Sequence, residues 1–316
     1  MLPRRPYAVP LPTDGVLRLG ARTLVMGVLN LAPDSFAGGP ARPDPARAIE
    51  QAMQLAAEGA DILDIGGEST RPGAEPISEA EELARVLPVL DGLAGRIAVP
   101  ISIDTYKAAV ADAALARGAA IVNDVSGLQY DPALAGVVVR RGAAVVLMHT
   151  RGRPVRMYDE ARYEDVAAEV AAELAARVAA AVAAGVSREQ VILDPGLGFA
   201  KRAEHSYAAL AGLERLAALD RPLLVGPSRK SFLTAALGPR APAERDWGTA
   251  AAVTAAVLLG AHIVRVHAVR EMVDVIRVAD LIRGMIRGTD TGDESFPNEG
   301  PKLPSPSTTG GPANPR

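Results

Sequence analysis

The chain alternates between short apolar runs and longer segments of helical period. The apolar runs are rich in Val, Ile and Leu, as buried strands are, and they cover 23–30, 61–67, 100–105, 120–126, 144–150, 191–198, 222–228 and 262–268. Between them, apolar positions three and four residues apart predict helices at about 44–58, 78–94, 106–117, 131–141, 164–184, 204–219, 245–260 and 270–286.

This succession of strand–helix units predicts a parallel sheet that helices cover. At 316 residues, a closed (β/α)8 barrel (a TIM barrel of the α/β class) fits the pattern better than an open sheet. Asp44 before Pro45, and Ser78 with Glu81, are typical of helix starts. Four glycines stand just past predicted helix ends, where a left-handed residue is favoured: Gly59, Gly118, Gly142 and Gly185. We therefore expect a single barrel domain at 23–287.

The two ends of the chain differ from this pattern. Residues 1–22 hold four prolines, and the segment GVLRLGARTL (15–24) predicts an N-terminal hairpin in a position to plug the barrel floor. From 288 to 316 the chain is rich in Pro, Gly, Ser and Thr and nearly free of aliphatic residues. Such a segment buries too little apolar surface to offset its chain entropy, so we expect a disordered tail.

Composition excludes several classes of protein and site. The net charge of −3 gives no reason to expect nucleic acid or an acidic membrane surface as a partner. Because the chain has no cysteine, a disulfide framework, a thiolate metal site and a cysteine nucleophile are excluded. We see neither a secretory signal nor a spanning run of about 18 apolar residues, and we expect a soluble, cytoplasmic protein.

Polar residues stand where the predicted strands end. They are Asn30, Asp64, Glu68, Asp104, Asn123, His149, Asp194, Ser228, Arg265 and His267. A single one could simply cap a loop, but a barrel built only for stability needs no such ring. Catalytic groups of (β/α)8 barrels lie at the C-terminal ends of the strands. The sequence therefore predicts an active site at that rim.

Several of these residues lie in longer motifs: MGVLNLAPDSF (26–36), DIGGESTRPGA (64–74), SIDTYK (102–107), NDVSG (123–127), DPGLGFAK (194–201), SRKSF (228–232) and RVH (265–267). In content, order and spacing this set resembles the signature motifs of dihydropteroate synthases, over roughly residues 23–285. The resemblance implies a (β/α)8 barrel, usually a homodimer. It also implies condensation of 6-hydroxymethyl-7,8-dihydropterin pyrophosphate with p-aminobenzoate, assisted by Mg2+, to give dihydropteroate and pyrophosphate.

The pterin site is predicted from the polar edge of the ring, which alternates donors and acceptors. A carboxylate accepts two N–H bonds from such an edge, so Asp194 is the first candidate, with Asn123 and Asp104 around the ring. Lys230 suits the carbonyl oxygen and a ring nitrogen, and we add Met148 and Phe199 as pterin contacts. The alternatives are a turn aspartate for Asp194, a helix N-cap for Asp104 and a surface lysine for Lys230.

Pyrophosphate requires cations and hydrogen-bond donors. Arg265 and His267 are two residues apart at the end of the last strand, so both side chains point to one side, where barrels commonly bind phosphates. The resemblance implies that they bind the pyrophosphate and that Asn30 ligates Mg2+, which takes its other ligands from phosphate and water. An internal salt bridge is the alternative for Arg265. We expect Asp104, Lys230 and Arg265 to be the catalytic residues.

The loops at 31–41 and 68–77 are polar and rich in Gly and Pro, which suits mobile lids. Their residues match family positions that close over p-aminobenzoate and pyrophosphate: Ser35, Phe36, Thr70, Arg71 and Pro72. The resemblance assigns Thr70 and Arg71 to pyrophosphate. It assigns Ser35, Phe36, Arg71, Pro72, Lys230 and Ser231 to p-aminobenzoate. Ordinary loop polarity is the alternative for any one of them.

The sequence departs from the family pattern at four places. The first loop reads APDSFAGGP, and MHTRGRP, GFAK and RVHAV also differ from the usual motifs. A catalytically weak pterin-binding paralogue is therefore one alternative. Another is a methyltetrahydrofolate-binding methyltransferase domain, although the SRKSF, RVH and STRPG segments argue against it. Among the remaining side chains, we expect His205 and His262 to be structural, and Trp247 and Phe232 to be core or helix-packing residues.

Overall fold

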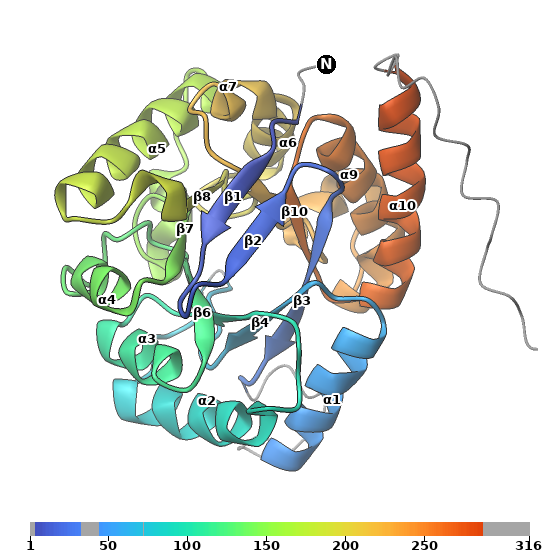
Figure 1. The fold of residues 1–316 in the computed structure, drawn as a ribbon. Coiled ribbons are helices and arrows are strands. Elements are labelled where there is room, and N and C mark those ends of the chain that lie inside the picture. Colours follow the sequence, from blue (N-terminus) through green and yellow to red (C-terminus); the bar gives the residue numbers. More distant parts are fainter. Residues whose placement is uncertain (1–3, 33–43, 72, 287–316) are drawn as a thin grey trace, which may run out of the picture.

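The computed structural model describes residues 4–32, 44–71 and 73–286, and it confirms the (β/α)8 barrel with an N-terminal hairpin (Figure 1). The barrel strands are β3 (Leu24–Asn30), β4 (Ile62–Gly66), β5 (Ile101–Asp104), β6 (Ala119–Asp124), β7 (Ala144–Met148), β8 (Val191–Asp194), β9 (Leu224–Val225) and β10 (Ile263–Val266). They pair in parallel in the order β8-β7-β6-β5-β4-β3-β10-β9. An isolated parallel bridge between Leu193 and Leu223 closes the ring.

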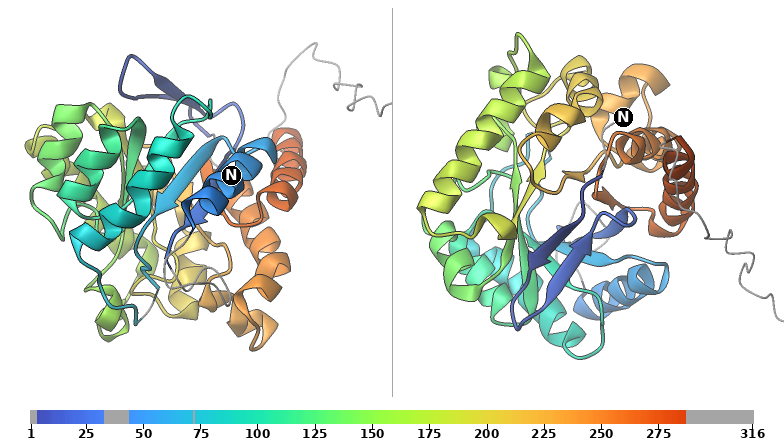
Figure 2. Two further views of the ribbon diagram at one scale, coloured as in Figure 1. Left: turned by 90° about the horizontal axis from the view of Figure 1, so that it is seen from below. Right: turned by 45° about the horizontal axis from the view of Figure 1, so that its top comes forward.

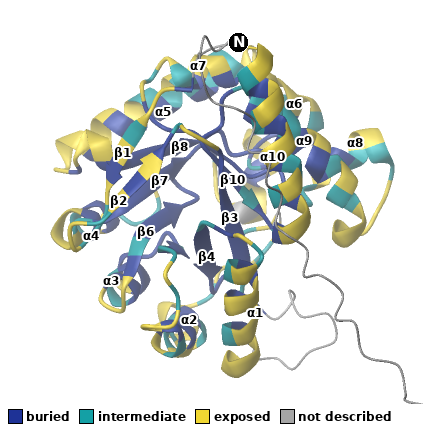
Figure 3. Ribbon diagram, turned by 45° about the vertical axis from the view of Figure 1, so that its right-hand side comes forward, coloured by how far each residue is buried: buried dark blue, intermediate teal, exposed yellow. Residues whose placement is uncertain are grey.

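Helices surround the strands, as the burial pattern in Figure 3 shows. They are α1 (Pro45–Ala57), α2 (Glu79–Leu93), α3 (Ala108–Leu115), α4 (Leu134–Arg141), α5 (Val166–Ala183), α6 (Ala203–Ala211), α7 (Leu213–Ala217), α8 (Thr234–Leu237), α9 (Asp246–Leu258) and α10 (Val269–Ile286). Short 3-10 turns add η2 (Pro154–Glu160), η3 (Arg188–Gln190), η4 (Ser231–Leu233) and η5 (Pro242–Arg245). Within the described ranges, no helix combines the length and apolar character that crossing a bilayer requires.

The predicted helix starts are built from side-chain caps. Asp44 accepts a hydrogen bond from the backbone N–H of Ala46 at 3.0 Å, and the Ser78 hydroxyl accepts one from Glu81 at 3.2 Å. These caps satisfy amide groups that the first helical turn leaves without partners. They explain why α1 and α2 begin within a residue of the predicted positions.

The N-terminal hairpin consists of β1 (Tyr7–Pro10) and β2 (Val16–Leu19), and it crosses one end of the barrel (Figures 1 and 2). Val9, Leu17 and Leu19 are buried in a cluster with side chains from inside the barrel. The barrel members of that cluster are Leu24, Met26, Ile62, Ile121, Ala144, Val146, Ile192, Leu224 and Ile263. The hairpin therefore closes the floor of the barrel.

His262 joins the hairpin to the last strand. The backbone N–H of Leu223 donates to His262 Nδ1 at 3.1 Å, and His262 Nε2 lies 3.0 Å from the carbonyl oxygen of Arg5. Since Nδ1 accepts, the proton resides on Nε2, which donates to Arg5. Burial lowers the pKa of His262 to about 4, so the ring is neutral. This is the structural role that we expected.

Three sequence-based expectations were wrong in detail. The helix expected at 204–219 is interrupted at Gly212, where an added Cβ would lie 2.4 Å from the Cβ of Ala167 on α5. The strand expected at 222–228 shortens to two residues, flanked by Pro222 and Pro227, because proline cannot donate to a sheet ladder. Trp247 is 85% exposed instead of packed, while Phe232 is buried as expected. The predicted tail at 288–316 lies outside the described residues.

Candidate functional site

Strand register aligns the predicted polar residues at the C-terminal rim of the barrel. Asn30 is level with Gly66, Gly66 with Asp104, and Asp104 with Asn123. Further around, Met148 is level with Asp194. Residues of the sequence-predicted ring from five strands thus stand at or near one edge, with Arg265 as the last residue but one of β10, which pairs with β3.

Side-chain alternation explains why these groups point inward. Residues of the floor cluster face the barrel interior, and a side chain two positions further along a strand faces the same way. This step leads from Ile62 to Asp64, from Ile121 to Asn123, from Ile192 to Asp194 and from Ile263 to Arg265. The barrel interior is therefore apolar at the floor and polar toward the rim.

Arg265 is the centre of a buried polar network. Its Nε donates to Asp64 Oδ2 at 2.6 Å, and its Nη2 donates to Asp104 Oδ2 at 2.7 Å. Asn123 Nδ2 donates to the same Asp64 oxygen at 3.0 Å. The internal salt bridge considered for Arg265 is thus present. A guanidinium carries five N–H donors, so this pairing leaves donors for a ligand.

Two carboxylate oxygens of this network have no partner among the described residues. They are Asp64 Oδ1 and Asp104 Oδ1, and the nearby strand hydroxyl of Ser102 on β5 is also unpaired there. Burial raises the pKa of Asp104 to about 7, against the opposing charge of Arg265 and with that of Asp64 adding to the rise. Buried acceptors in this state favour a ligand that brings N–H donors.

Asp194 and Lys230 are two further titratable groups at the rim, and the charge of each affects the pKa of the other. Asp194 Oδ1 accepts from the Gly196 N–H at 2.7 Å, while Lys230 Nζ donates to the Leu197 carbonyl at 2.6 Å. Burial lowers the pKa of Lys230 to about 8, although the charge of Asp194 opposes the shift. Burial likewise raises the pKa of Asp194, and Lys230 is the strongest opposing charge. The two side chains therefore interact electrostatically within one desolvated region.

Apolar side chains lie beside these charges. Tyr106, Val125 and Met148 form a buried cluster against which Tyr130 and Phe199 pack. The ammonium of Lys230 lies 4.6 Å from the centre of the Phe199 ring. The structure thus brings together Met148, Phe199 and Lys230, which the sequence assigned to one ligand. A flat apolar surface beside buried hydrogen-bonding groups suits a polar heteroaromatic ring.

His267 is positioned by Ser228, which the sequence reading did not assign to a ligand. The Ser228 hydroxyl accepts from the His267 backbone N–H at 3.2 Å and lies 2.9 Å from His267 Nδ1. Burial, and then the charge of Arg265, lowers the pKa of His267 to about 3, so the ring is neutral. If the Ser228 hydroxyl donates to Nδ1, then Nε2–H remains as a hydrogen-bond donor.

The cation expected at Asn30 has one plausible protein ligand. Asn30 Oδ1 accepts from the Ala32 N–H at 2.9 Å and keeps a second lone pair. In the part of the chain that the structure describes, no three His, Cys, Asp or Glu side chains come together to hold a metal ion. One carboxamide oxygen fits Mg2+, which keeps several waters and binds substrate phosphates.

The remaining predicted residues belong to loops. Arg71 is close enough to His267 for its charge to help lower the pKa of that ring. Thr70, which precedes Arg71 in the sequence, is half-buried. Ser231 is exposed at the start of η4, directly after Lys230. Ser35, Phe36 and Pro72, with most of the first predicted lid, lie outside the described residues.

Asp64 is the most important rim residue that the sequence reading left without a role. It is fully buried and orients both Arg265 and Asn123, which the sequence assigned to different ligands. The available signal was a single charge within the apolar strand ILDIG. That signal places Asp64 at the strand end, but it does not reveal which side chains the carboxylate contacts.

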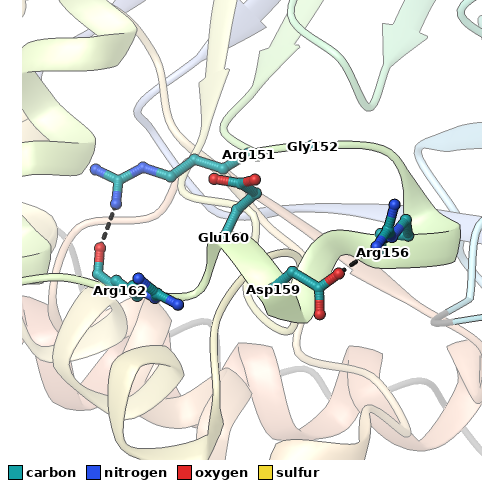
Figure 4. Close-up of a pocket in the computed structure, with 6 residues that line it drawn as sticks. All are labelled: Arg151, Gly152, Arg156, Asp159, Glu160 and Arg162. Atoms are coloured by element: carbon teal, nitrogen blue, oxygen red, sulfur yellow. Dashed lines mark hydrogen bonds and ion pairs between the residues drawn. The ribbon is translucent and has the colours of Figure 1, made fainter.

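A hollow of about 640 Å3 lies outside this ring of residues, on the segment that follows β7 (Figure 4). It is lined by Arg151, Gly152, Arg156, Asp159, Glu160 and Arg162. Its charges pair locally: Arg156 contacts Asp159 at 3.2 Å, and Arg151 contacts Glu169 at 2.8 Å. We place the functional site at the rim instead, because the buried unpaired carboxylate oxygens of Asp64 and Asp104 are there.

Comparisons with known proteins show what the whole chain is similar to. A family model described as pterin binding enzyme matches residues 26–267. The chain is 46% identical over 277 residues to the dihydropteroate synthase of Synechocystis sp., covering 87% of this chain and 96% of that relative.

Solved structures of the same kind of enzyme share the fold. The Yersinia pestis dihydropteroate synthase, crystallised with a sulfonamide drug complex, has a TM-score of 0.82 at 39% identity and covers 86% of this chain and 98% of its own. The Burkholderia cenocepacia dihydropteroate synthase, complexed with 7,8-dihydropteroate, has a TM-score of 0.80 at 42% identity, with 89% and 98% coverage.

Proposed function

The chain belongs to the dihydropteroate synthases of the pterin-binding enzyme family, which are transferases of folate biosynthesis, and from this premise we propose which residues hold each substrate. The reaction joins 6-hydroxymethyl-7,8-dihydropterin pyrophosphate to p-aminobenzoate and releases pyrophosphate. The observation that carries the assignment is the buried rim network of Arg265, Asp64 and Asp104 with its unpaired carboxylate oxygens.

The pterin ring binds inside the rim, between the apolar cluster and the buried carboxylates. Asp194 accepts from the amino-pyrimidine edge, and Asn123 and Asp104 contact the rest of the ring, since each presents oxygen or N–H groups in a desolvated position. Lys230 donates to the carbonyl side of the ring. Met148 and Phe199 supply the apolar contacts.

The pyrophosphate binds toward β10 and β3. Arg265 donates to it with the N–H groups that Asp64 and Asp104 do not use, and His267 donates through Nε2. The rest of the pyrophosphate subsite consists of Asn30, Thr70 and Arg71. Asn30 is close to Arg265 because β3, which it ends, pairs with β10. Asn30 is the protein ligand for Mg2+, whose charge, when bound, offsets that of the leaving group.

p-Aminobenzoate enters from the loop side of the rim. We assign its carboxylate to Ser231 and Arg71, and we assign Ser35, Phe36 and Pro72, which lie outside the described residues, to the same substrate. Lys230 lies between this subsite and the pterin, because its ammonium contacts Leu197 and the Phe199 ring while Ser231 follows it in sequence.

In the reaction the carbon–oxygen bond between the pterin methylene and pyrophosphate breaks, and the leaving group takes the electron pair. The arylamine nitrogen then supplies the pair for the new carbon–nitrogen bond and loses one proton. Arg265 and His267 stabilise the negative charge that develops on the leaving oxygen. Asp104 and Asp194 stabilise the positive charge on the pterin methylene. Fixed groups of this kind, placed in a desolvated site, lower the barrier without reorganising.

A direct assay tests the proposal. The purified protein is mixed with the pterin pyrophosphate, labelled p-aminobenzoate and Mg2+, and we expect labelled dihydropteroate. Asp194→Ala and Arg265→Ala should each reduce kcat/KM by about 100-fold or more, in line with the loss of one preorganised group. Binding of both substrates without product would instead favour a pterin-binding paralogue. Wild-type rates in both variants would refute the residue assignment.

We also propose a homodimer in the cytoplasm. Five exposed apolar residues of α10 fall on one helical face: Val278, Leu281, Ile282, Met285 and Ile286. Their spacing of three and four residues makes a continuous stripe. An apolar stripe of this size is typical of a protein interface, and a second copy of the chain is the occupant that we propose.

A further inference from the structure

Behind the proposed pterin site lies a set of buried and half-buried polar side chains, none of which is itself a predicted ligand residue. It consists of His149 after β7, Glu173 and Arg177 on α5, and Lys201 in the loop after β8, and we call it the brace. We propose that the brace positions the pterin-binding walls, with Lys201 as its main positioning residue. This inference rests on the proposed pterin site.

Lys201 ties the loop after β8 to the end of β7. Its Nζ donates to His149 Nδ1 at 2.7 Å, to the Phe199 carbonyl at 3.1 Å and to the Gly196 carbonyl at 3.2 Å. The side chain is only 1% exposed, so no solvent replaces these bonds. The His149 carbonyl oxygen, at 3.4 Å, is a fourth acceptor close to the same Nζ. Lys201 therefore fixes the backbone on both sides of the segment that carries Phe199.

His149 transmits this constraint to α5. Because Nδ1 accepts from Lys201, the ring proton is on Nε2, which donates to Glu173 Oε2 at 3.0 Å. Burial, followed by the charge of Lys201, lowers the pKa of His149 to about 3, which keeps the ring neutral and able to accept. Glu173 thus holds His149 in the tautomer whose Nδ1 can accept a hydrogen bond from Lys201.

Arg177 fixes the segment after β7 that carries Met148. It donates to the carbonyls of Met148 and Thr150, each at 2.5 Å, from one helical turn beyond Glu173. The brace therefore hydrogen-bonds the backbone of both apolar residues assigned to the pterin: Met148 through Arg177 and Phe199 through Lys201.

The loop after β8 approaches the end of β7 backbone to backbone, so no side chain can pack between them at Gly196. Gly196 has a φ of +66°, and a Cβ there would lie 2.0 Å from the His149 carbonyl oxygen. Asp194, two residues earlier, anchors one oxygen on the Gly196 N–H. A shift of Lys201 would thus move the turn that orients the Asp194 carboxylate. Burial lowers the pKa of Lys201 well below its usual value, and the charge of Asp194 is the strongest influence opposing that shift.

Lys201→Met tests the proposal, because methionine keeps the length of the side chain and loses every donor. We expect the KM for the pterin pyrophosphate to rise by about 10- to 100-fold, since misplacing a site by about 1 Å can have an effect of up to about 100-fold. The KM for p-aminobenzoate should change less than about twofold. Arg215→Met removes an exposed cation on α7 and serves as the matched control, with wild-type constants expected.

Glu173→Gln provides a second variant that is less prone to misfolding, because this side chain is about one-third exposed and its shape is retained. It should raise the same KM by a smaller factor and leave that for p-aminobenzoate unchanged. Equal rises in both constants, or no change in properly folded Lys201→Met, would overturn the inference.

Equilibrium binding of the pterin substrate distinguishes the brace proposal from the proposed function. If wild-type protein binds it but makes no product, the enzymatic assignment fails, while weaker binding by the variants still supports the brace.

Discussion

At the scale of single residues, Asp64 shows how one carboxylate can serve two subsites. One oxygen accepts from Arg265 and Asn123, which we assign to pyrophosphate and pterin respectively. A buried charge without its partner is unfavourable, so Arg265 depends on Asp64 for its position as well as for its charge balance. The carboxylate is therefore a positioning residue for both substrates.

Asp64→Asn tests this role. The amide retains the size of the carboxylate but loses the charge and turns a donor toward the network, so we expect kcat/KM to fall by about 10- to 100-fold, the value of a hydrogen bond to a charged group. Asp61→Asn is the control from the same region of the chain, because Asp61 pairs with the exposed Arg22 beyond the other end of β4. Steady-state kinetics on both proteins check the prediction. Equal kcat/KM values for the two would contradict it.

The charge of Lys230 predicts a pH dependence. Burial lowers the pKa of Lys230 to about 8, so the ammonium is present below that pH and is lost as the pH rises through it. We expect kcat/KM for the pterin substrate to fall above about pH 8, because the free enzyme's ionisations govern this constant. Lys230→Arg should move this alkaline limb upward by about 2 pH units or more, since arginine stays charged to about pH 12. An unchanged limb in that variant would assign it to another group.

The rim residues could be predicted because strand ends are visible in the sequence. Asn123, Asp194 and Arg265 each follow an apolar run, and the barrel topology alone brings them to one edge. Their contacts could not be predicted, because Asp64 and Asp104 are 40 residues apart in sequence and meet only through Arg265. The Lys201–His149 contact was invisible for the same reason, since it depends on how two loops cross.

At the scale of elements, the hairpin is the part of the fold that separates stability from function. Its apolar side chains pack against the floor, at the end of the barrel opposite the rim residues. Leu17→Ala should lower the free energy of unfolding by about 2 kcal/mol, because it leaves a cavity between hairpin and floor. Both KM values should stay unchanged, since the rim is not touched. Urea denaturation and steady-state kinetics measure the two effects.

Val16→Ala is the matched control on the same strand. Val16 is 48% exposed, whereas Leu17 faces the cluster. A change within about 0.5 kcal/mol is expected for such a surface position. A similar loss of stability in both variants would show that strand propensity, and not the plug, accounts for the effect.

Element boundaries were predictable where a local signal sets them. Asp44 and Ser78 cap their helices with their own side chains, and four predicted glycines do take positive φ values: Gly59, Gly118, Gly142 and Gly185. The break at Gly212 was not predictable, because it follows from the approach of Ala167 on another helix. The prediction for Trp247 was wrong for a related reason. A tryptophan side chain is usually buried, but the position of Trp247 on α9 faces solvent.

At the scale of the whole molecule, the barrel places its apolar and polar interior at opposite ends. The floor cluster contains only apolar side chains, whereas the rim concentrates aspartates, one arginine and one lysine in buried or half-buried positions. Desolvated charges of this kind destabilise a fold unless they are paired. The floor and the outer core between strands and helices therefore supply stability that the rim does not.

The apolar stripe on α10 predicts the state of association. Leu281 lies in the middle of the stripe and is 56% exposed, so a charge there would be desolvated in a dimer but harmless in a monomer. We expect wild-type protein to be a dimer by light scattering coupled to size-exclusion chromatography. Leu281→Glu should shift it to a monomer at micromolar concentration, with an unchanged circular dichroism spectrum.

A second variant separates the stripe from a general effect of added charge. Val182→Glu places the same charge on α5, where Val182 is 43% exposed and lies on a different helix from the stripe, and it should remain dimeric. If Leu281→Glu also remains dimeric, the interface involves another surface. If the monomer retains its kcat/KM, the dimer contributes stability alone, because the rim residues that we assign to both substrates all come from one chain.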